Sequence, residues 1–272
     1  FRRQDGKDEP KMAFTVHAVM PGVWHIVDCM GVCMTLLEGE NAAMLVDTGY
    51  GIEDVADFMR HMTDLPLTVF LTHNHHDHAM GARCFPETYM LEADMADWRM
   101  FTNDEMRRRV LTQAIGKNLP VDEKTFLAGE IPLPKVMKPG VIDLGGLTAE
   151  IIEAPGHTPG SAVVYVPERK LLLSGDDWNP CTWLFFPQAL GLREYRSNMR
   201  GIQQLPFEKV LCPHREALYD RWMFDDFFNA LTDGNLRAAE PVNIAPYEQI
   251  DTCQATLPHD QVLVFDWAKS GL

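Results

Sequence analysis

The pattern His-x-His-x-Asp-His at residues 73–78 constrains this chain more than any other feature of its sequence. Its named positions place three imidazoles and one carboxylate within six residues, and these groups suit Zn²⁺ or a similar divalent ion. The apolar stretch at residues 68–72, directly before it, predicts a buried strand. The pattern is therefore expected at a strand end, where a loop can bring side chains around one point.

The spacing within the pattern separates its ligands into two pairs. His73 and His75 are two residues apart, so in extended backbone they point to the same side. Asp77 and His78 are adjacent and turn away where the chain enters a helix predicted around residues 79–82. One pair can serve one metal ion and the other pair a second ion close by. His76 occupies a variable position and is expected to point away from the ions.

Three further ligand candidates follow along the chain, each at a predicted strand end. His157 lies in a tight turn rich in Pro and Gly, Asp176 follows a buried apolar run, and His214 follows another strand-like run. Any one of them alone would more often be a hydrogen-bonded loop residue. Together with the first pattern they predict a metal centre.

These motifs, together with Asp47 in the Val-Asp-Thr-Gly turn at residues 46–49, make the chain resemble the metallo-β-lactamase superfamily over roughly residues 23–214. The resemblance implies an α/β fold, a four-layer αβ/βα sandwich with the metals at one edge of its two sheets. Such a sandwich would use nearly the whole chain, so we expect residues 1–12 to form an N-terminal tail and residues 13–272 a single domain.

The resemblance also implies a role for each ligand, position by position. His73, His75 and His157 would hold one metal ion, and Asp77, His78 and His214 would hold a second. Asp176 would bridge the two ions, and Asp47 would orient a ligand without binding metal. Two divalent ions are expected, with Zn as the preferred metal and Fe or Mn as alternatives.

Two adjacent cations favour hydrolysis. A hydroxide bridging them is a strong nucleophile at neutral pH, because metal binding lowers the pKa of water to about 7. Asp77 is expected to orient this hydroxide and to carry a proton to the leaving group. The expected reaction is cleavage of an ester, lactone or thioester of a small molecule that has an apolar part.

Two insertions are expected near the active site, at residues 92–139 and 177–200. The second is rich in large apolar side chains, which we expect to line a substrate pocket or, equally, to pack as an ordinary crossing loop. The candidates for substrate binding are Trp178, Trp183, Phe185, Phe186 and Tyr195.

Other functions remain open. A mononuclear iron enzyme resembling the persulfide dioxygenases would use His73, His157 and Asp176. Asp176 at the bridging position resembles the glyoxalase II-like thioesterases, lactonases and phosphodiesterases more than true β-lactamases, so a phosphodiesterase is a further alternative. A non-catalytic binding protein is the third, and the complete ligand set disfavours it.

Composition narrows the partners to a small-molecule substrate. The formal net charge of −15 disfavours nucleic acid, and the basic run at residues 107–109 is expected to be a solvated helix face.

No apolar run reaches the roughly 18–20 residues that span a bilayer, and the first ten residues lack the apolar segment of a signal peptide. The six cysteines lack paired metal spacing and suggest reduced thiols in a cytoplasmic protein. A homo-oligomer is left open.

The apolar patterning predicts strand clusters in two halves, with helices at residues 51–62 and 92–116. Strands are expected at residues 14–19, 23–29, 33–38, 43–47, 67–72, 141–144, 147–153, 161–166, 170–174, 209–212 and 261–267.

Overall fold

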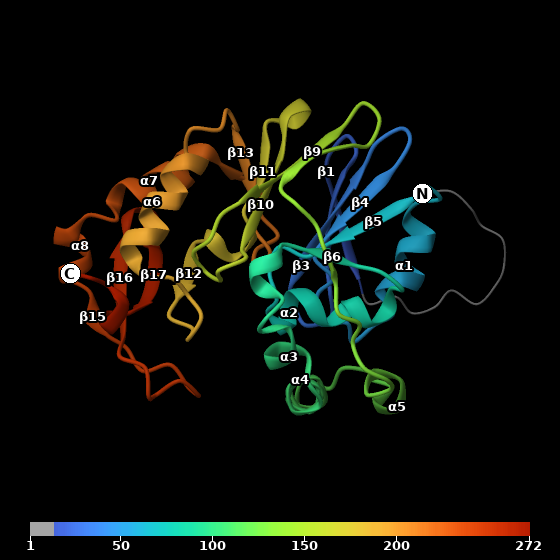
Figure 1. Cartoon of the computed structure of the whole chain (residues 1–272), viewed down its shortest axis with the longest axis horizontal. Coiled ribbons are helices and arrows are strands. Elements are labelled where there is room, and N and C mark those ends of the chain that lie inside the picture. Colours follow the sequence, from blue (N-terminus) through green and yellow to red (C-terminus); the bar gives the residue numbers. More distant parts are fainter. Residues whose placement is uncertain (1–13) are drawn as a thin grey trace.

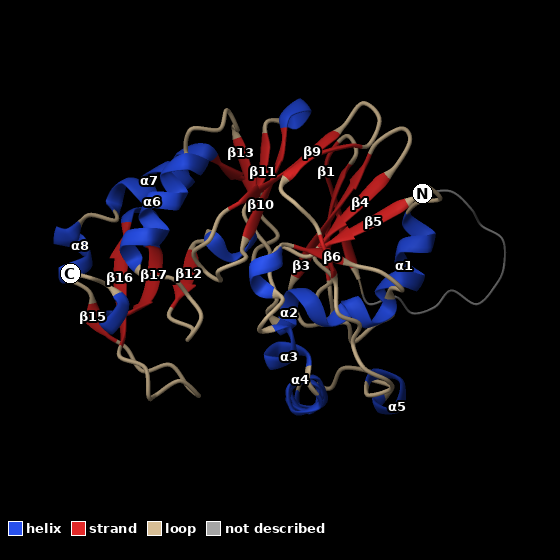
Figure 2. Cartoon of the chain, in the orientation of Figure 1, coloured by secondary structure: helices blue, strands red, loops and turns tan. Residues whose placement is uncertain are grey.

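The computed structural model describes residues 14–272, so the predicted tail at residues 1–12 lies outside the described part of the chain. Two sheets face each other at the centre of the molecule, with helices on their outer sides (Figure 1; helices and strands are distinguished in Figure 2). This is the four-layer αβ/βα sandwich that the resemblance implies.

The first sheet has seven strands in chain order. Its first four strands are antiparallel, and the remaining pairs are parallel. The strands are β1 Thr15–Met20, β2 Val23–Val27, β3 Cys33–Glu38, β4 Ala43–Val46, β5 Leu67–Phe70, β6 Tyr89–Met90 and β7 Lys135–Val136.

The second sheet has six strands in the order β14-β13-β11-β10-β9-β8. Its central strand β10 is buried at all five positions, as expected for a strand that is covered on both faces. The strands are β8 Gly140–Asp143, β9 Thr148–Glu153, β10 Ala162–Val166, β11 Leu171–Leu173, β13 Lys209–Leu211 and β14 Tyr219–Asp220.

A third, smaller sheet lies beyond the helices of the second half (Figure 1). It consists of β12 Cys181–Leu184, β17 Gln261–Asp266, β16 Thr252–Leu257 and β15 Glu240–Pro241, in that spatial order. One apolar cluster contains side chains of the second sheet, the neighbouring helices and the third sheet, so the third sheet extends a shared core.

Helices cover both outer faces of the sandwich. Helix α1 begins where the Asp54 carboxylate accepts a hydrogen bond from the Asp57 amide at 2.9 Å, and its apolar side packs on the first sheet. The helices are α1 Val55–Met62, α2 His76–Ala79, α3 Trp98–Thr102, α4 Asp104–Gly116, α5 Glu123–Phe126, α6 Leu192–Ile202, α7 Arg221–Ala230 and α8 Asp233–Arg237. Among residues 14–272, no helix has the length and apolar character needed to cross a membrane.

The helix predicted over residues 92–116 is interrupted. It divides at Asn103, whose backbone is extended and whose side chain accepts a hydrogen bond from the Met106 amide at 2.8 Å. Asn103 therefore ends α3 and begins α4, because a capping side chain competes with continuation of the helix.

The expectation of a solvated basic face is wrong for Arg107. Its side chain is 1% exposed and donates hydrogen bonds to the carbonyl oxygens of Phe126, Ala128 and Gly129. Arg107 therefore holds the turn after α5. Its neighbours at positions 108 and 109 are exposed, as expected.

Candidate metal centre

All predicted ligands lie at strand ends along one edge of the sandwich. The His-x-His-x-Asp-His segment follows β5, His157 follows β9, Asp176 follows β11 and His214 follows β13. Because β11 and β13 are parallel, their carboxyl ends meet at the same edge of the sheet. The fold thus brings together residues that are up to 141 positions apart in the sequence, from His73 to His214.

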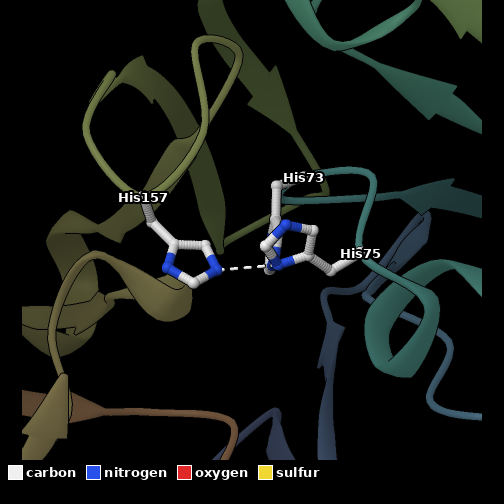
Figure 3. Close-up of side chains that lie close together, drawn as sticks. All are labelled: His73, His75 and His157. Atoms are coloured by element: carbon white, nitrogen blue, oxygen red, sulfur yellow. Dashed lines mark hydrogen bonds between the residues drawn. The ribbon is translucent and has the colours of Figure 1, made fainter. Parts of the chain in front are cut away.

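Three imidazoles form the first cluster (Figure 3). His73, His75 and His157 are 1%, 4% and 1% exposed, and each offers a nitrogen within 4.8 Å of the nitrogens of the other two. His157 Nε2 lies 2.8 Å from His75 Nδ1. Burial lowers the pKa of all three, so their nitrogens remain neutral and keep the lone pairs that metal ions bind.

Two carboxylates and two imidazoles form the second cluster: Asp77, His78, Asp176 and His214. Asp176 lies between the clusters, since its Oδ2 is 3.1 Å from His214 Nε2 and 3.5 Å from His157 Nε2. Its Oδ1 is 3.4 Å from His78 Nε2. Asp176 is thus placed to contact ions at both clusters.

The donor atoms fit metal ions. His73 Nε2, His78 Nε2 and Asp176 Oδ1 are buried and have no hydrogen-bond partner among the described residues. A buried polar atom without a partner costs about 1–3 kcal/mol, which a bound cation would remove. Imidazole nitrogens with carboxylate oxygens suit Zn²⁺, iron or manganese.

Charge in the second cluster keeps its carboxylates ionised. Burial raises the pKa of Asp77, but His78, His76 and His214 outweigh it and lower the pKa to about 2. Burial also raises the pKa of Asp176, but His214 and His78 outweigh it and hold the pKa well below its ordinary range. For His78, burial lowers the pKa, but Asp176, Asp77 and Asp47 raise it well above the ordinary value. A cation at His78 Nε2 would take the place of that proton.

Hydrogen bonds at the Nδ1 atoms of three ligand histidines fix the orientation of their rings. Asp47 adopts a left-handed backbone, with φ of 64°, and its Oδ2 lies 3.0 Å from His78 Nδ1. Thr72 Oγ1 lies 3.0 Å from His73 Nδ1, and His157 Nδ1 lies 2.7 Å from the Trp183 carbonyl oxygen. In each case the nitrogen with a partner turns the other nitrogen toward its cluster.

The sequence reasoning missed Asp94, which joins the two ligand loops. This buried carboxylate accepts hydrogen bonds from the amides of Asn74 at 3.1 Å and Gly160 at 2.6 Å, and from Thr158 Oγ1 at 2.7 Å. Asn74 lies between two ligands of the first loop, and Thr158 follows His157. No pattern around Asp94 distinguishes it from a surface helix residue.

The aromatic candidates fall into two groups. Trp178, Phe185 and Tyr195 are fully buried, and Trp178 and Tyr195 belong to the apolar core of the second half. Phe185 packs against the rings of Trp183, Phe186 and Tyr247. Trp178 Nε1 donates to Gln261 Oε1 at 3.2 Å, and the Tyr195 hydroxyl donates to the Asp177 carbonyl oxygen. These contacts give the three residues a packing role.

Other aromatic rings lie beside the first cluster, and two of them contact its histidines directly. Phe186 lies 4.7 Å from the His75 ring centroid and 5.5 Å from that of His157. Phe101, which the sequence reasoning did not single out, lies 4.4 Å from His75. Tyr247, also missed, packs 5.4 Å from Phe186, and Trp183 lies 6.2 Å from Phe186 with 38% of its surface exposed.

His76 does not belong to either cluster, as predicted from its variable position. Its Nδ1 lies 4.0 Å from Asp77 Oδ1, and its ring packs edge-on against Tyr50 at 5.5 Å.

Comparisons with known proteins identify the family of the chain. The sequence profile of the Metallo-beta-lactamase superfamily matches residues 27–214. Acyl-coenzyme A thioesterase MBLAC2 from Gallus gallus is 26% identical over 200 residues, which cover 66% of this chain and 70% of that protein.

Solved structures share the fold at low sequence identity. The metallo-beta-lactamase from Pontibacter korlensis has a TM-score of 0.57 and 18% identity, and the match covers 79% of this chain and 97% of that chain. The metallo-beta-lactamase FIM-1 from Pseudomonas aeruginosa, in its mono-zinc form, has a TM-score of 0.56 and 16% identity, with 78% and 92% covered.

Proposed function

The chain belongs to the metallo-beta-lactamase superfamily and is a hydrolase, and we propose that it cleaves thioesters or esters of small molecules that carry an apolar acyl group. The observation that carries the proposal is the contact of Phe101 and Phe186 with His75, a predicted metal ligand, at ring distances of 4.4 and 4.7 Å. An apolar group beside the reacting carbonyl would therefore lie against aromatic side chains.

We assign the metal ions to the two clusters. His73, His75 and His157 would hold one divalent ion, Asp77, His78 and His214 the other, and Asp176 would contact both. Zn is the preferred metal. When bound, such ions polarise a substrate carbonyl and lower the pKa of water to about 7.

Asp77 is the proposed catalytic residue. It stays ionised at neutral pH, since its pKa is lowered to about 2, and its Oδ2 lies 3.6 Å from His78 Nε2 and 3.7 Å from His214 Nε2. An ionised carboxylate in this place can accept a proton from the attacking water. It can then deliver that proton to the leaving group.

The proposed acyl wall consists of Phe101, Trp183, Phe186 and Tyr247. Phe101 and Phe186 approach His75 from different elements, α3 and the segment after β12. Trp183 and Tyr247 extend the Phe186 side outward, and Trp183 is partly open to solvent. Of the five aromatic residues predicted to bind substrate, we retain Trp183 and Phe186, because Trp178, Phe185 and Tyr195 are fully buried.

Polar groups lie beside His214 in the second cluster. The His214 side chain is 28% exposed, and the exposed Arg215 donates from its guanidinium to the His214 carbonyl oxygen at 2.8 Å. A polar or anionic leaving group would lie on this side. The thioesterase activity named for the Gallus gallus relative supports a thioester as the first substrate to test.

A substrate panel tests the proposal. The zinc-loaded protein would be assayed with thioesters and esters of acyl chains from two to twelve carbons, with lactones, a β-lactam and a phosphodiester, and oxygen uptake would be recorded. Because each buried methylene contributes up to about 0.8 kcal/mol, kcat/KM should rise with acyl length until the wall is covered. Faster cleavage of the phosphodiester, oxygen consumption, or no dependence on acyl length would reject the proposal.

A further inference from the structure

Gln188 lies against the first cluster, on the side of His75 that faces away from the other histidines. His75 Nδ1 is 2.8 Å from His157 Nε2, whereas His75 Nε2 is 2.6 Å from the carboxamide nitrogen of Gln188. Phe101 and Phe186 also pack against the His75 ring. Among residues 14–272, Gln188 is the hydrogen-bond partner of His75 Nε2.

A neutral imidazole carries one proton, and its position decides which nitrogen can bind metal. If Nδ1 binds the ion in the first cluster, the proton must be on Nε2, and a buried N–H needs an acceptor. A carboxamide presents an oxygen at one end and an amino group at the other, and a half-turn exchanges them. The Gln188 oxygen is buried and has no donor among the described residues, so it is free to accept this proton.

We propose that Gln188 is a positioning residue that holds the His75 ring and fixes the proton on Nε2, which leaves Nδ1 for the metal ion. The inference rests on the metal centre proposed above. It assigns a role to a residue outside the ligand motifs, on the segment that leads from β12 to α6.

Lys269, near the end of the chain, holds this segment in place. Its ammonium donates hydrogen bonds to three carbonyl oxygens around Gln188, those of Phe186 at 3.2 Å, Pro187 at 2.6 Å and Ala189 at 3.0 Å. Two residues after Gln188, the Leu190 amide donates to the Gly156 carbonyl oxygen at 2.9 Å. Gln188 is thus fixed between the C-terminal segment and the turn that carries His157.

The test compares Gln188→Met, which removes the acceptor at nearly the same size, with Gln188→Glu, which keeps an acceptor and adds charge. Gln113→Met on the exposed side of α4 is the matched control. Zn²⁺ affinity would be measured by competition with a chromophoric chelator, and the His75 tautomer by ¹⁵N NMR of the zinc-loaded protein. Thermal unfolding in the presence of EDTA would verify that each variant folds.

We expect Gln188→Met to weaken Zn²⁺ binding by roughly 10- to 100-fold, the range for lost partners of metal ligands. Gln188→Glu should bind at least as tightly as the wild type, and Gln113→Met should not differ from it. If both Gln188 variants bind like the wild type, or both weaken binding equally, the inference is overturned. If Gln188→Met fails to fold, the comparison of Gln188→Glu with the wild type decides. A wild type that binds no metal would overturn the proposed metal centre and this inference with it.

Lys269→Met provides an independent measurement. If Lys269 acts through Gln188, it should weaken Zn²⁺ binding in the wild type but add little in the Gln188→Met background, since coupled residues are not additive. Fully additive losses would show that Lys269 does not act through Gln188.

Discussion

The rings of Phe185 and Phe186 stack with their centroids 4.7 Å apart and their planes inclined by 26°, yet the two residues differ in burial and in their contact with the first cluster. Phe185 is fully buried and packs against the rings of Trp183, Phe186 and Tyr247. Phe186 lies over it, partly buried, and faces His75 and His157. The inner ring therefore supports the ring that is available to a substrate.

Substitution of these two neighbours should separate stability from specificity. We expect Phe185→Ala to lower the free energy of unfolding by about 3–5 kcal/mol, as for buried Phe residues in other proteins. Phe186→Ala should lower it less and should raise KM for long acyl substrates, reducing discrimination by roughly 10- to 200-fold. Urea unfolding and the acyl-length series measure the two effects, with the remote exposed Trp222→Ala as control. Equal losses of stability in both variants would make Phe186 another core residue.

Trp183 and Tyr247 should act on the same specificity without affecting metal binding. Both rings extend the wall outward from Phe186, at 6.2 and 5.4 Å, and neither contacts a predicted ligand through its ring. We expect Trp183→Ala and Tyr247→Ala to raise KM for long acyl chains more than for acetyl substrates, with metal content unchanged by elemental analysis. Unchanged kinetics for every chain length would place the pocket elsewhere, with the 92–139 insertion as the next segment to test.

Asp94 should make stability depend on pH. Burial raises its pKa to about 6 from an ordinary value of 3.8, although Thr158, Gly160 and Asn74 donate hydrogen bonds to it. The folded chain thus holds this proton more tightly than the unfolded chain. The resulting stabilisation is fully present below about pH 4 and is lost as the pH rises through about 6.

We expect the free energy of unfolding of the wild type, relative to that of Asp94→Asn, to fall by about 2 kcal/mol between about pH 4.5 and pH 7. Urea unfolding of both proteins in matched buffers measures this difference, and titration of the histidines affects both proteins alike. A difference that stays constant with pH would mean that the folded and unfolded chains share one Asp94 pKa.

The sequence predicted the parts of the site whose signals are local. Each ligand follows a short apolar run, and such runs form strands whose ends meet at one edge, as β5 and β11 do. Asp94 and Gln188 carry no local signal, because their roles depend on contacts with loops 20 to 113 residues away in the sequence. Tyr247 reaches the aromatic wall only through packing between distant segments.

The third sheet was predicted only in part: a strand was expected at residues 261–267, where β17 lies, but β12, β15 and β16 were not expected. Strand β12 lies within the aromatic run interpreted as a loop, and its parallel partner β17 begins some 80 residues later, with Cys181 opposite Val262. Helix α6 was missed despite a readable signal. Its buried residues Leu192, Tyr195, Met199 and Ile202 recur at the three- and four-residue spacing of a helix. The aromatic residues that precede this segment favoured instead the prediction of a substrate pocket.

The two clusters should hold about two metal ions per chain, since seven ligands exceed what one tetrahedral ion takes. Asp176→Ala should reduce this to one ion or fewer after dialysis, because Asp176 faces His214, His157 and His78 at 3.1, 3.5 and 3.4 Å. Elemental analysis of protein purified without chelator measures the ratio, with Asp226→Asn as control, since Asp226 pairs with His259 and belongs to neither cluster. A reproducible ratio of one in the metal-supplemented wild type would contradict the binuclear arrangement and favour a mononuclear enzyme.

Asp77 should be essential for turnover and dispensable for folding. We expect Asp77→Asn and Asp77→Ala to lower kcat by at least about 10²-fold, the scale of lost general acid–base catalysis, while circular dichroism stays near that of the wild type. Asn keeps the size of the side chain and an oxygen that can contact metal, but it cannot accept a proton, so metal content should fall less in Asp77→Asn than in Asp77→Ala. The exposed Asp64→Asn serves as the matched control.

Because the pKa of Asp77 is lowered to about 2, the wild type should not lose activity through protonation of Asp77 above about pH 4, and a loss near neutral pH would belong to other groups. Near-normal turnover in a folded, metal-loaded Asp77→Asn would remove the carboxylate from the mechanism.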